Sequence, residues 1–146
     1  LMPYMVSKFN IRVYGIWIKE NKILVSHEEI NGFKMLKLPG GGLEYGEGPM
    51  QCVKREFMEE LGVTITIQRL VHTTGNFVQS AFKKADQVIA IHYLVNTNDP
   101  IQSMTTAQPT RLGGTNYHRF EWQVFDKELI ENLTFDMDKQ ALVKLV

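Results

Sequence analysis

The sequence has few of the features that direct a chain to a membrane, an oxidising compartment or a polyanionic partner. Among its 146 residues there is one cysteine, Cys52, which cannot form an internal disulfide. No apolar run reaches the roughly 18 residues of a membrane-spanning helix, and no secretory leader is present. Sixteen basic residues balance sixteen acidic ones, and no Lys/Arg block exceeds two residues. These absences favour a cytoplasmic protein and argue against nucleic acid or a membrane as a partner.

Length and composition predict one globular domain. A chain of 146 residues, 44% of them apolar, can bury one core of ordinary size and is too short for two. We expect the domain to span residues 1–146, with residues 1–6 as a frayed leader or a vector remnant. Alternating β-branched and aromatic residues predict strands at 9–19, 23–29, 33–38, 64–77, 87–95 and 120–125.

Turn residues separate these strands. Residues 20–22 and the Asn31-Gly32 pair predict hairpin turns, and residues 96–115 predict a long loop. Pro39 ends the third strand, so we expect the three glycines that follow it to be irregular. Together with the helices, this order predicts an α/β domain with a mixed sheet.

A helix is predicted between Pro49 and Gly62. Proline suits the first helical position, and glycine suits the left-handed residue just past the end. Apolar residues recur at helical spacing and are expected to form the buried face: Met50, Val53, Phe57 and Leu61. A second helical region is expected after Asp126, with a break at 134–136.

Three glutamates share the neighbouring face of the first helix. At 100° per residue, Glu56, Glu59 and Glu60 occupy an arc of roughly 100°. Acidic helix faces are common on stable proteins, so the charge alone does not establish a function. Glu59 and Glu60, however, lie in the last turn, where the helix dipole disfavours anions by about 0.3 to 1 kcal/mol each. We therefore expect a divalent cation, Mg²⁺ or Mn²⁺, because clustered carboxylate oxygens suit these hard ions.

The glycine triplet adds backbone groups to the same site. Gly40, Gly41 and Gly42 permit positive φ and close backbone approach, so their amides or carbonyls can meet a metal ion or a phosphate. The alternative is a tight connection between strand and helix, which needs one or two glycines rather than three. Joined to the acidic helix, the triplet predicts a site for a metal and a phosphate.

Residues 41–63 resemble the Nudix box, G-x5-E-x7-R-E-U-x-E-E-x-G-U, where U is a bulky apolar residue. Every fixed position is satisfied, by Gly41, Glu47, Arg55, Glu56, Phe57, Glu59, Glu60, Gly62 and Val63. The chain is thus similar to MutT-like Nudix hydrolases, which implies an α/β/α sandwich with a mixed β-sheet. The resemblance also implies an enzyme that hydrolyses the diphosphate linkage of a nucleoside diphosphate joined to a group X.

The resemblance assigns metal binding and catalysis to the helix. Glu56, Glu59 and Glu60 would ligate the divalent cation, and the Gly40 carbonyl would be a further ligand. Glu56 is the first candidate for the group that polarises the attacking water. Arg55 would orient the neighbouring glutamate.

Other residues are expected to support the site or to contact the substrate. Glu47 would brace the loop and the helix, while Gly41, Gly42 and Glu44 would bind substrate. Members of this family differ in which glutamate is the base, and some use one from a later loop. Here the only acidic residue close before Trp122 is Glu121, and strand alternation decides whether Glu121 faces the site.

The substrate stays open at this point. The box is not followed by the proline common in ADP-ribose pyrophosphatases or by the tyrosine of diadenosine polyphosphate hydrolases, which favours a nucleoside triphosphate pyrophosphohydrolase, including one that removes oxidised nucleotides. The alternatives are a hydrolase of a nucleotide sugar or ADP-ribose and a non-catalytic nucleotide sensor. Exposed strand edges favour a homodimer. Aromatic candidates for a nucleobase pocket are Phe33, Phe77, Phe82, Tyr93 and Tyr117.

Overall fold

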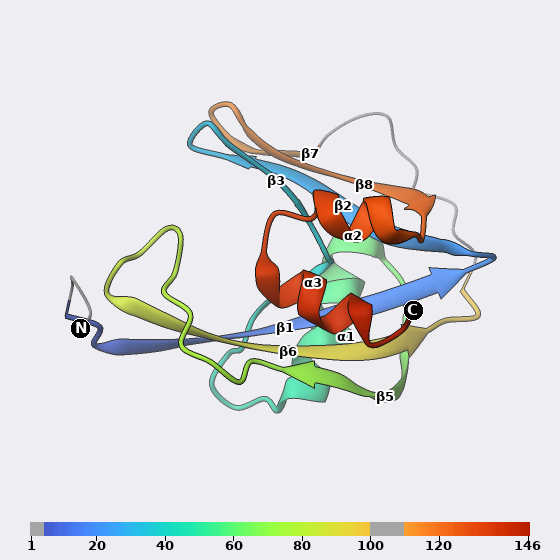
Figure 1. The fold of residues 1–146 in the computed structure, drawn as a ribbon, viewed down its shortest axis with the longest axis horizontal. Helices are drawn as coiled ribbons and strands as arrows, with labels where there is room; N and C mark the ends of the chain where they lie inside the picture. Colours follow the sequence, from blue (N-terminus) through green and yellow to red (C-terminus); the bar gives the residue numbers. More distant parts are fainter. Residues whose placement is uncertain (1–4, 100–109) are drawn as a thin grey trace.

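The computed structural model describes residues 5–99 and 110–146, which fold into a sheet with helices on both faces (Figure 1). Its strands are β1 (Lys8–Lys19), β2 (Lys22–Ile30), β3 (Phe33–Lys37), β4 (Gly40–Gly42), β5 (Thr66–Thr73), β6 (Asp86–Asn96), β7 (Thr110–Gly113) and β8 (Asn116–Val124). Its helices are α1 (Pro49–Leu61), α2 (Lys127–Asn132) and α3 (Asp136–Val143). Figure 1 shows α1 behind the sheet and α2 and α3 in front, which confirms the predicted α/β/α sandwich.

The sheet is mixed, as predicted. The strand order is β5-β6-β1-β2-β8-β7, with β3 added to β2 and β4 added to β1. β1 runs parallel to β6 and antiparallel to its other neighbours. Only the end of β1 pairs with β2, at Ile18–Ile23 and Lys19–Lys22, so the two halves of the sheet diverge from that point (Figure 1). This divergence opens a cleft between the β1 half and the β2–β3 half.

The hairpin turns are where the sequence predicts them. Glu20 and Asn21 have φ of 52° and 63°, and Asn31 and Gly32 have φ of 51° and 79°. These values are typical of the two-residue turns whose twist matches antiparallel strands. The predicted leader lies partly outside the described residues, and so does half of the predicted loop at 96–115, of which residues 110–113 form β7.

The glycine triplet is not irregular, and that prediction is wrong. Gly40–Gly42 forms the short strand β4, antiparallel to Arg12–Tyr14 of β1. A Cβ at Gly40 would lie 2.1 Å from a backbone oxygen of β1, and one at Gly41 would lie 2.4 Å from the Glu56 carboxylate. The glycines therefore serve close packing on both faces of a regular strand, rather than a break in it.

The buried face of α1 differs from the prediction at one position. Val53, Phe57 and Leu61 are buried, but Met50 in the first turn is 54% exposed. Cys52 is fully buried instead, with its thiol 3.5 Å from the carbonyl of Gly42. Cys52 is on the side of α1 that packs on β4, where its thiol faces the carbonyls of Gly41 and Gly42.

The C-terminal helices cover the other face. Asp126 caps α2 by accepting a hydrogen bond from the Leu129 amide at 2.9 Å, and the predicted break separates α2 from α3. A second core of apolar residues lies beneath these helices, including Ile16, Val25 and Leu142. Among the described residues, the structure has no helix long and apolar enough to cross a membrane.

Candidate functional site

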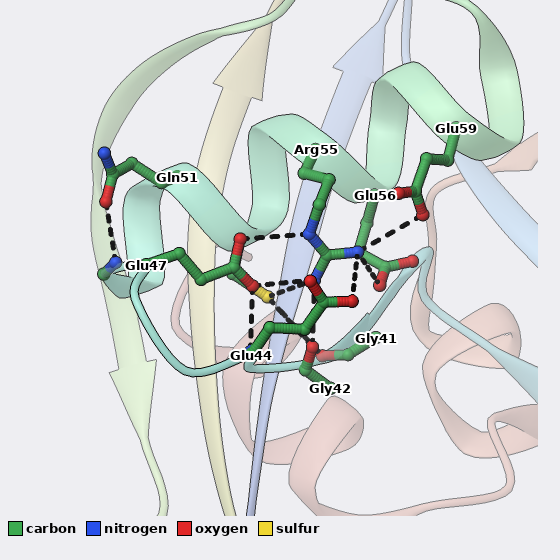
Figure 2. Close-up of polar contacts among 10 residues, drawn as sticks. Gly41, Gly42, Glu44, Glu47, Gln51, Arg55, Glu56 and Glu59 are labelled. Atoms are coloured by element: carbon green, nitrogen blue, oxygen red, sulfur yellow. Dashed lines mark hydrogen bonds and ion pairs between the residues drawn. The ribbon is translucent and has the colours of Figure 1, made fainter.

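Arg55 is the centre of a polar network that joins α1 to the loop after β4 (Figure 2). Its Nε and Nη2 donate to the two carboxylate oxygens of Glu47, at 3.0 and 2.7 Å. Nη2 also donates to the Gly42 carbonyl at 3.1 Å. Nη1 donates to Glu56 at 2.9 Å and to Glu59 at 3.2 Å. The structure thus brings three of the predicted carboxylates, Glu47, Glu56 and Glu59, together around one guanidinium.

Glu47 holds the loop against the helix. The backbone amide of Glu44 donates to Glu47 at 2.9 Å, while the Glu44 carboxylate is largely exposed and lies 3.6 Å from Arg55. Hydrogen bonds from Arg55 lower the pKa of Glu47 to about 2. The same bonds raise the pKa of Arg55, so this pair is ionised at neutral pH.

Glu47→Gln is expected to flatten the acid side of the stability profile. Because the folded-state pKa of Glu47 is about 2 and the ordinary value is 4.5, its ionised form stabilises the fold fully above pH 4.5, and this contribution is lost as the pH falls toward 2. Melting temperatures measured over this range should fall less steeply in the variant than in the wild type. Glu131→Gln, at an exposed position of α2, is the matched control. Equal slopes for E47Q and the wild type would contradict the role of this pairing.

Glu56 and Glu60, four residues apart on α1, interact electrostatically. The Glu56 side chain is 13% exposed and lies against Gly41. Burial, and then the charge of Glu56, raise the pKa of Glu60 to about 8, although Lys37 and Arg12 act in the opposite direction. Two carboxylates that repel each other in a partly buried position are in the electrostatic state that a bound cation relieves.

The carboxylates of Glu56, Glu59 and Glu60 have the chemistry to bind a divalent cation, but they do not converge on one point. Among residues 5–99 and 110–146, no group of three or more His, Cys, Asp or Glu side chains is close enough to hold a metal ion. Glu59 is the outlying member, since its side chain is 58% exposed and bound to Arg55. Glu56 and Glu60 supply the oxygens that Mg²⁺ and Mn²⁺ prefer.

The predicted backbone ligand, the Gly40 carbonyl, lies on the same edge of β4 as this network. The amides of Gly15 and Leu43 donate across the β1–β4 pair at 2.9 and 2.8 Å, which marks the hydrogen-bonded positions. Because these positions alternate in an antiparallel pair, Gly40 and Gly42 lie where carbonyls point away from β1. Arg55 donates a hydrogen bond to the Gly42 carbonyl. The Gly40 carbonyl points in the same direction, away from β1.

A cleft of about 550 Å³ lies between the diverging halves of the sheet, and its lining includes Arg12 and Tyr14, which pair with Gly42 and Gly40 of β4. Its inner end is lined by polar and charged side chains, namely Arg12, Tyr14, Glu28 and Lys37. Sequence reasoning did not single out any of these four. Further out the cleft runs along β1 to Phe9 and is bounded by Phe82.

The aromatic candidates divide between core and cleft. Tyr93 is 9% exposed and belongs to the core beneath α1. Phe82 lines the cleft and contacts Phe33 edge-on, with ring centroids 5.8 Å apart. Phe77 lines a neighbouring hollow instead, and Tyr117 lies opposite Glu29 in the β2–β8 pair. Phe82 is therefore the candidate that the structure brings to the cleft, and Phe33 packs against it from outside the cleft lining.

Glu121 is not brought to the glutamate pair. It lies opposite Val25, on the sheet face covered by α2 and α3, whereas the adjacent Phe120 and Trp122 pack on the α1 side. Its partners are His27 at 2.7 Å, Arg119 at 2.9 Å and Gln123. Burial would raise the pKa of Glu121, but these hydrogen bonds outweigh it and lower the pKa to about 2.

Comparison with known proteins agrees with this architecture. Residues 8–136 match the family model described as the NUDIX domain. A curated RNA pyrophosphohydrolase from Bartonella clarridgeiae is 35% identical over 48 residues, which are 33% of this chain and span only 28% of that protein's length.

Solved structures show the same fold over nearly the whole chain. The E. coli ORF135 protein is similar with a TM-score of 0.71 and 18% identity, over 94% of this chain and 89% of that chain. A MutT protein from Methanosarcina mazei Go1 is similar with a TM-score of 0.69 and 18% identity, over 97% and 95% of the two chains. The family model covers all but the ends of the sequence, and on that match the chain belongs to the Nudix hydrolase family.

Proposed function

We propose that this protein is a pyrophosphohydrolase that uses Mg²⁺ or Mn²⁺ to cleave the diphosphate linkage of nucleoside triphosphates, including oxidised ones. The observation that carries the proposal is the coupled Glu56–Glu60 pair on α1, with Glu56 against Gly41 of β4, and a cleft of nucleotide size lined by Arg12 and Tyr14, the β1 residues that pair with β4. Nudix proteins generally use divalent metal ions, and the relative named RNA pyrophosphohydrolase supports attack on a pyrophosphate bond.

The residues of the chain have separate tasks in this reaction. Arg55 holds the Glu56 carboxylate in position and, through Glu47, fixes the loop that follows β4. Glu56 accepts the proton of the water that attacks phosphorus, and the bond from that phosphorus to the bridging oxygen breaks. Glu59, Glu60 and the Gly40 carbonyl would complete the metal ligands. A bound divalent cation would lower the pKa of the water and neutralise charge on the phosphate oxygens.

A substrate panel tests this function. Nucleoside triphosphates, 8-oxo-dGTP, nucleotide sugars, ADP-ribose and a 5′-triphosphate RNA are incubated with Mg²⁺ or Mn²⁺, and the products are identified by mass. We expect metal-dependent release of pyrophosphate from a nucleoside triphosphate. Turnover of ADP-ribose or a nucleotide sugar alone would reassign the group X, and tight nucleotide binding without turnover would favour a sensor.

A further inference from the structure

We propose that Arg12 binds the phosphate group next to the nucleoside, so that the substrate's phosphate chain crosses the glycine strand from the cleft to the Glu56–Glu60 pair. This inference rests on the proposed function and adds a specificity-determining residue outside the Nudix box. It places the nucleoside in the cleft and fixes the direction in which the phosphates run.

The first argument is the position of Arg12 relative to β4. Arg12 lies opposite Gly42, and a Cβ on Gly42 would be 3.7 Å from the Arg12 Nη1 atom. Gly41, the next residue, faces the Glu56 carboxylate from the opposite side. Since all three residues of β4 are glycines, this strand places no side chain between the Arg12 guanidinium and the Glu56 carboxylate. A diphosphate could therefore contact both without a side chain between them.

The second argument is that Arg12 is held in position and still has free donors. Its Nε donates to the Tyr14 hydroxyl at 2.8 Å. Tyr14 stacks on the buried His92, with ring centroids 5.1 Å apart, and His92 in turn lies 2.7 Å from the Asp138 carboxylate. Among the described residues, neither Nη1 nor Nη2 of Arg12 has a hydrogen-bond or ion-pair partner. The buried column formed by Tyr14, His92 and Asp138 orients the Arg12 guanidinium. The terminal nitrogens of Arg12 remain available to a ligand.

The third argument is the charge balance at the inner end of the cleft. Of the two cations at this end, Lys37 is paired with Glu28 at 3.4 Å, whereas Arg12 has no ion-pair partner within the part of the chain that the structure describes. Burial disfavours the charged form of Arg12, but Tyr14, Glu28 and Glu56 outweigh it and raise the pKa of this group. A permanently charged guanidinium in a partly buried cleft needs a counter-ion, and its planar pair of nitrogens matches two phosphate oxygens.

The fourth argument is the shape of the cleft beyond Arg12. It follows β1 outward from Arg12 to Lys8, which at about 3.3 Å per residue is roughly 13 Å. A nucleoside fits this length, and Phe82 supplies an aromatic ring for the base. With the nucleoside in this part of the cleft, the phosphate at Arg12 is the one attached to the sugar.

The experiment measures binding of AMP, GMP, CMP and UMP by calorimetry in EDTA, so that no divalent cation contributes. The wild type should bind at least one of them, and Arg12→Gln should weaken this binding by about 10- to 100-fold, the cost of lost charged hydrogen bonds. Arg12→Lys keeps the charge but loses the paired terminal nitrogens of the guanidinium, so its affinity for the monophosphate should lie between those of the wild type and Arg12→Gln. Lys34→Gln is the matched control, because Lys34 is exposed on β3 outside the cleft.

Kinetics separate this proposal from the proposed function. For any substrate that the panel identifies, Arg12→Gln should raise KM by a similar factor with little change in kcat. Monophosphate binding that depends on Arg12 supports the proposal even if the wild type hydrolyses nothing, in which case the hydrolase assignment alone fails. Wild-type affinity in Arg12→Gln, or no monophosphate binding by the wild type at millimolar concentration, would overturn it. If Arg12→Gln melts before the assay temperature, Arg12→Lys decides by the same criteria.

Discussion

Glu60→Gln should make the metal-free protein more stable and nearly inactive. Loss of the metal ligand that we propose at Glu60 should remove several kcal/mol of transition-state stabilisation, which corresponds to a fall in kcat of about 10²- to 10⁴-fold. The stability gain follows from the raised pKa of Glu60, about 8, because the folded protein favours the uncharged side chain beside Glu56. Glutamine imitates that uncharged form at every pH, so the repulsion disappears.

Two measurements on this variant separate its effects. In EDTA at neutral pH, the melting temperature of Glu60→Gln should exceed that of the wild type. Added Mg²⁺ should then raise the melting temperature of the wild type far more than that of the variant, because the variant has lost a ligand. Glu131→Gln is the control for removal of one carboxylate. Unchanged turnover in Glu60→Gln would contradict its assignment as a metal ligand.

The first helix and the mixed α/β order could be predicted from local sequence pattern, whereas the α/β/α sandwich was implied by the resemblance to the Nudix family. The proline at the start of α1, the glycine after it and the fixed acidic spacings are set by a few neighbouring residues. The hairpin turns at Asn21 and Asn31 are equally local. What the pattern could not supply was the partner of the glycine triplet, because pairing with β1 is a contact between residues far apart in the chain.

The charged residues of the cleft show the same limit. Arg12 and Tyr14 are two residues apart, so strand alternation places both side chains on one face of β1. Alternation does not tell whether that face contacts the core, the solvent or a cleft. That depends on where β1 leaves β2 and the sheet diverges. The same holds for Glu121, whose sheet face could not be decided from the sequence. Its neighbours Phe120 and Trp122 pack on the α1 side, and its own side chain lies on the opposite face.

Asp138 connects three elements that the site depends on. It is 1% exposed, and its two carboxylate oxygens have different partners: Oδ1 lies 2.7 Å from His92 Nε2, and Oδ2 accepts a hydrogen bond from the Leu38 amide at 3.3 Å. The first contact fixes the ring beneath Tyr14. The second fixes the chain just before β4. Asp138 therefore ties α3 to β6 and to the start of the glycine strand.

Asp138→Ala is expected to lower the free energy of unfolding by about 3 to 5 kcal/mol, because it leaves a buried imidazole and a buried amide without their partner. Urea denaturation measures this loss. Asp138→Asn keeps one oxygen for the Leu38 amide and should lose less. Asp136→Ala, at the first position of the same helix, should cost only about 0.3 to 1 kcal/mol through the helix dipole. Equal losses at Asp136 and Asp138 would show that the buried connection contributes nothing beyond helix capping, and the column beneath Arg12 would then have to be held by packing alone.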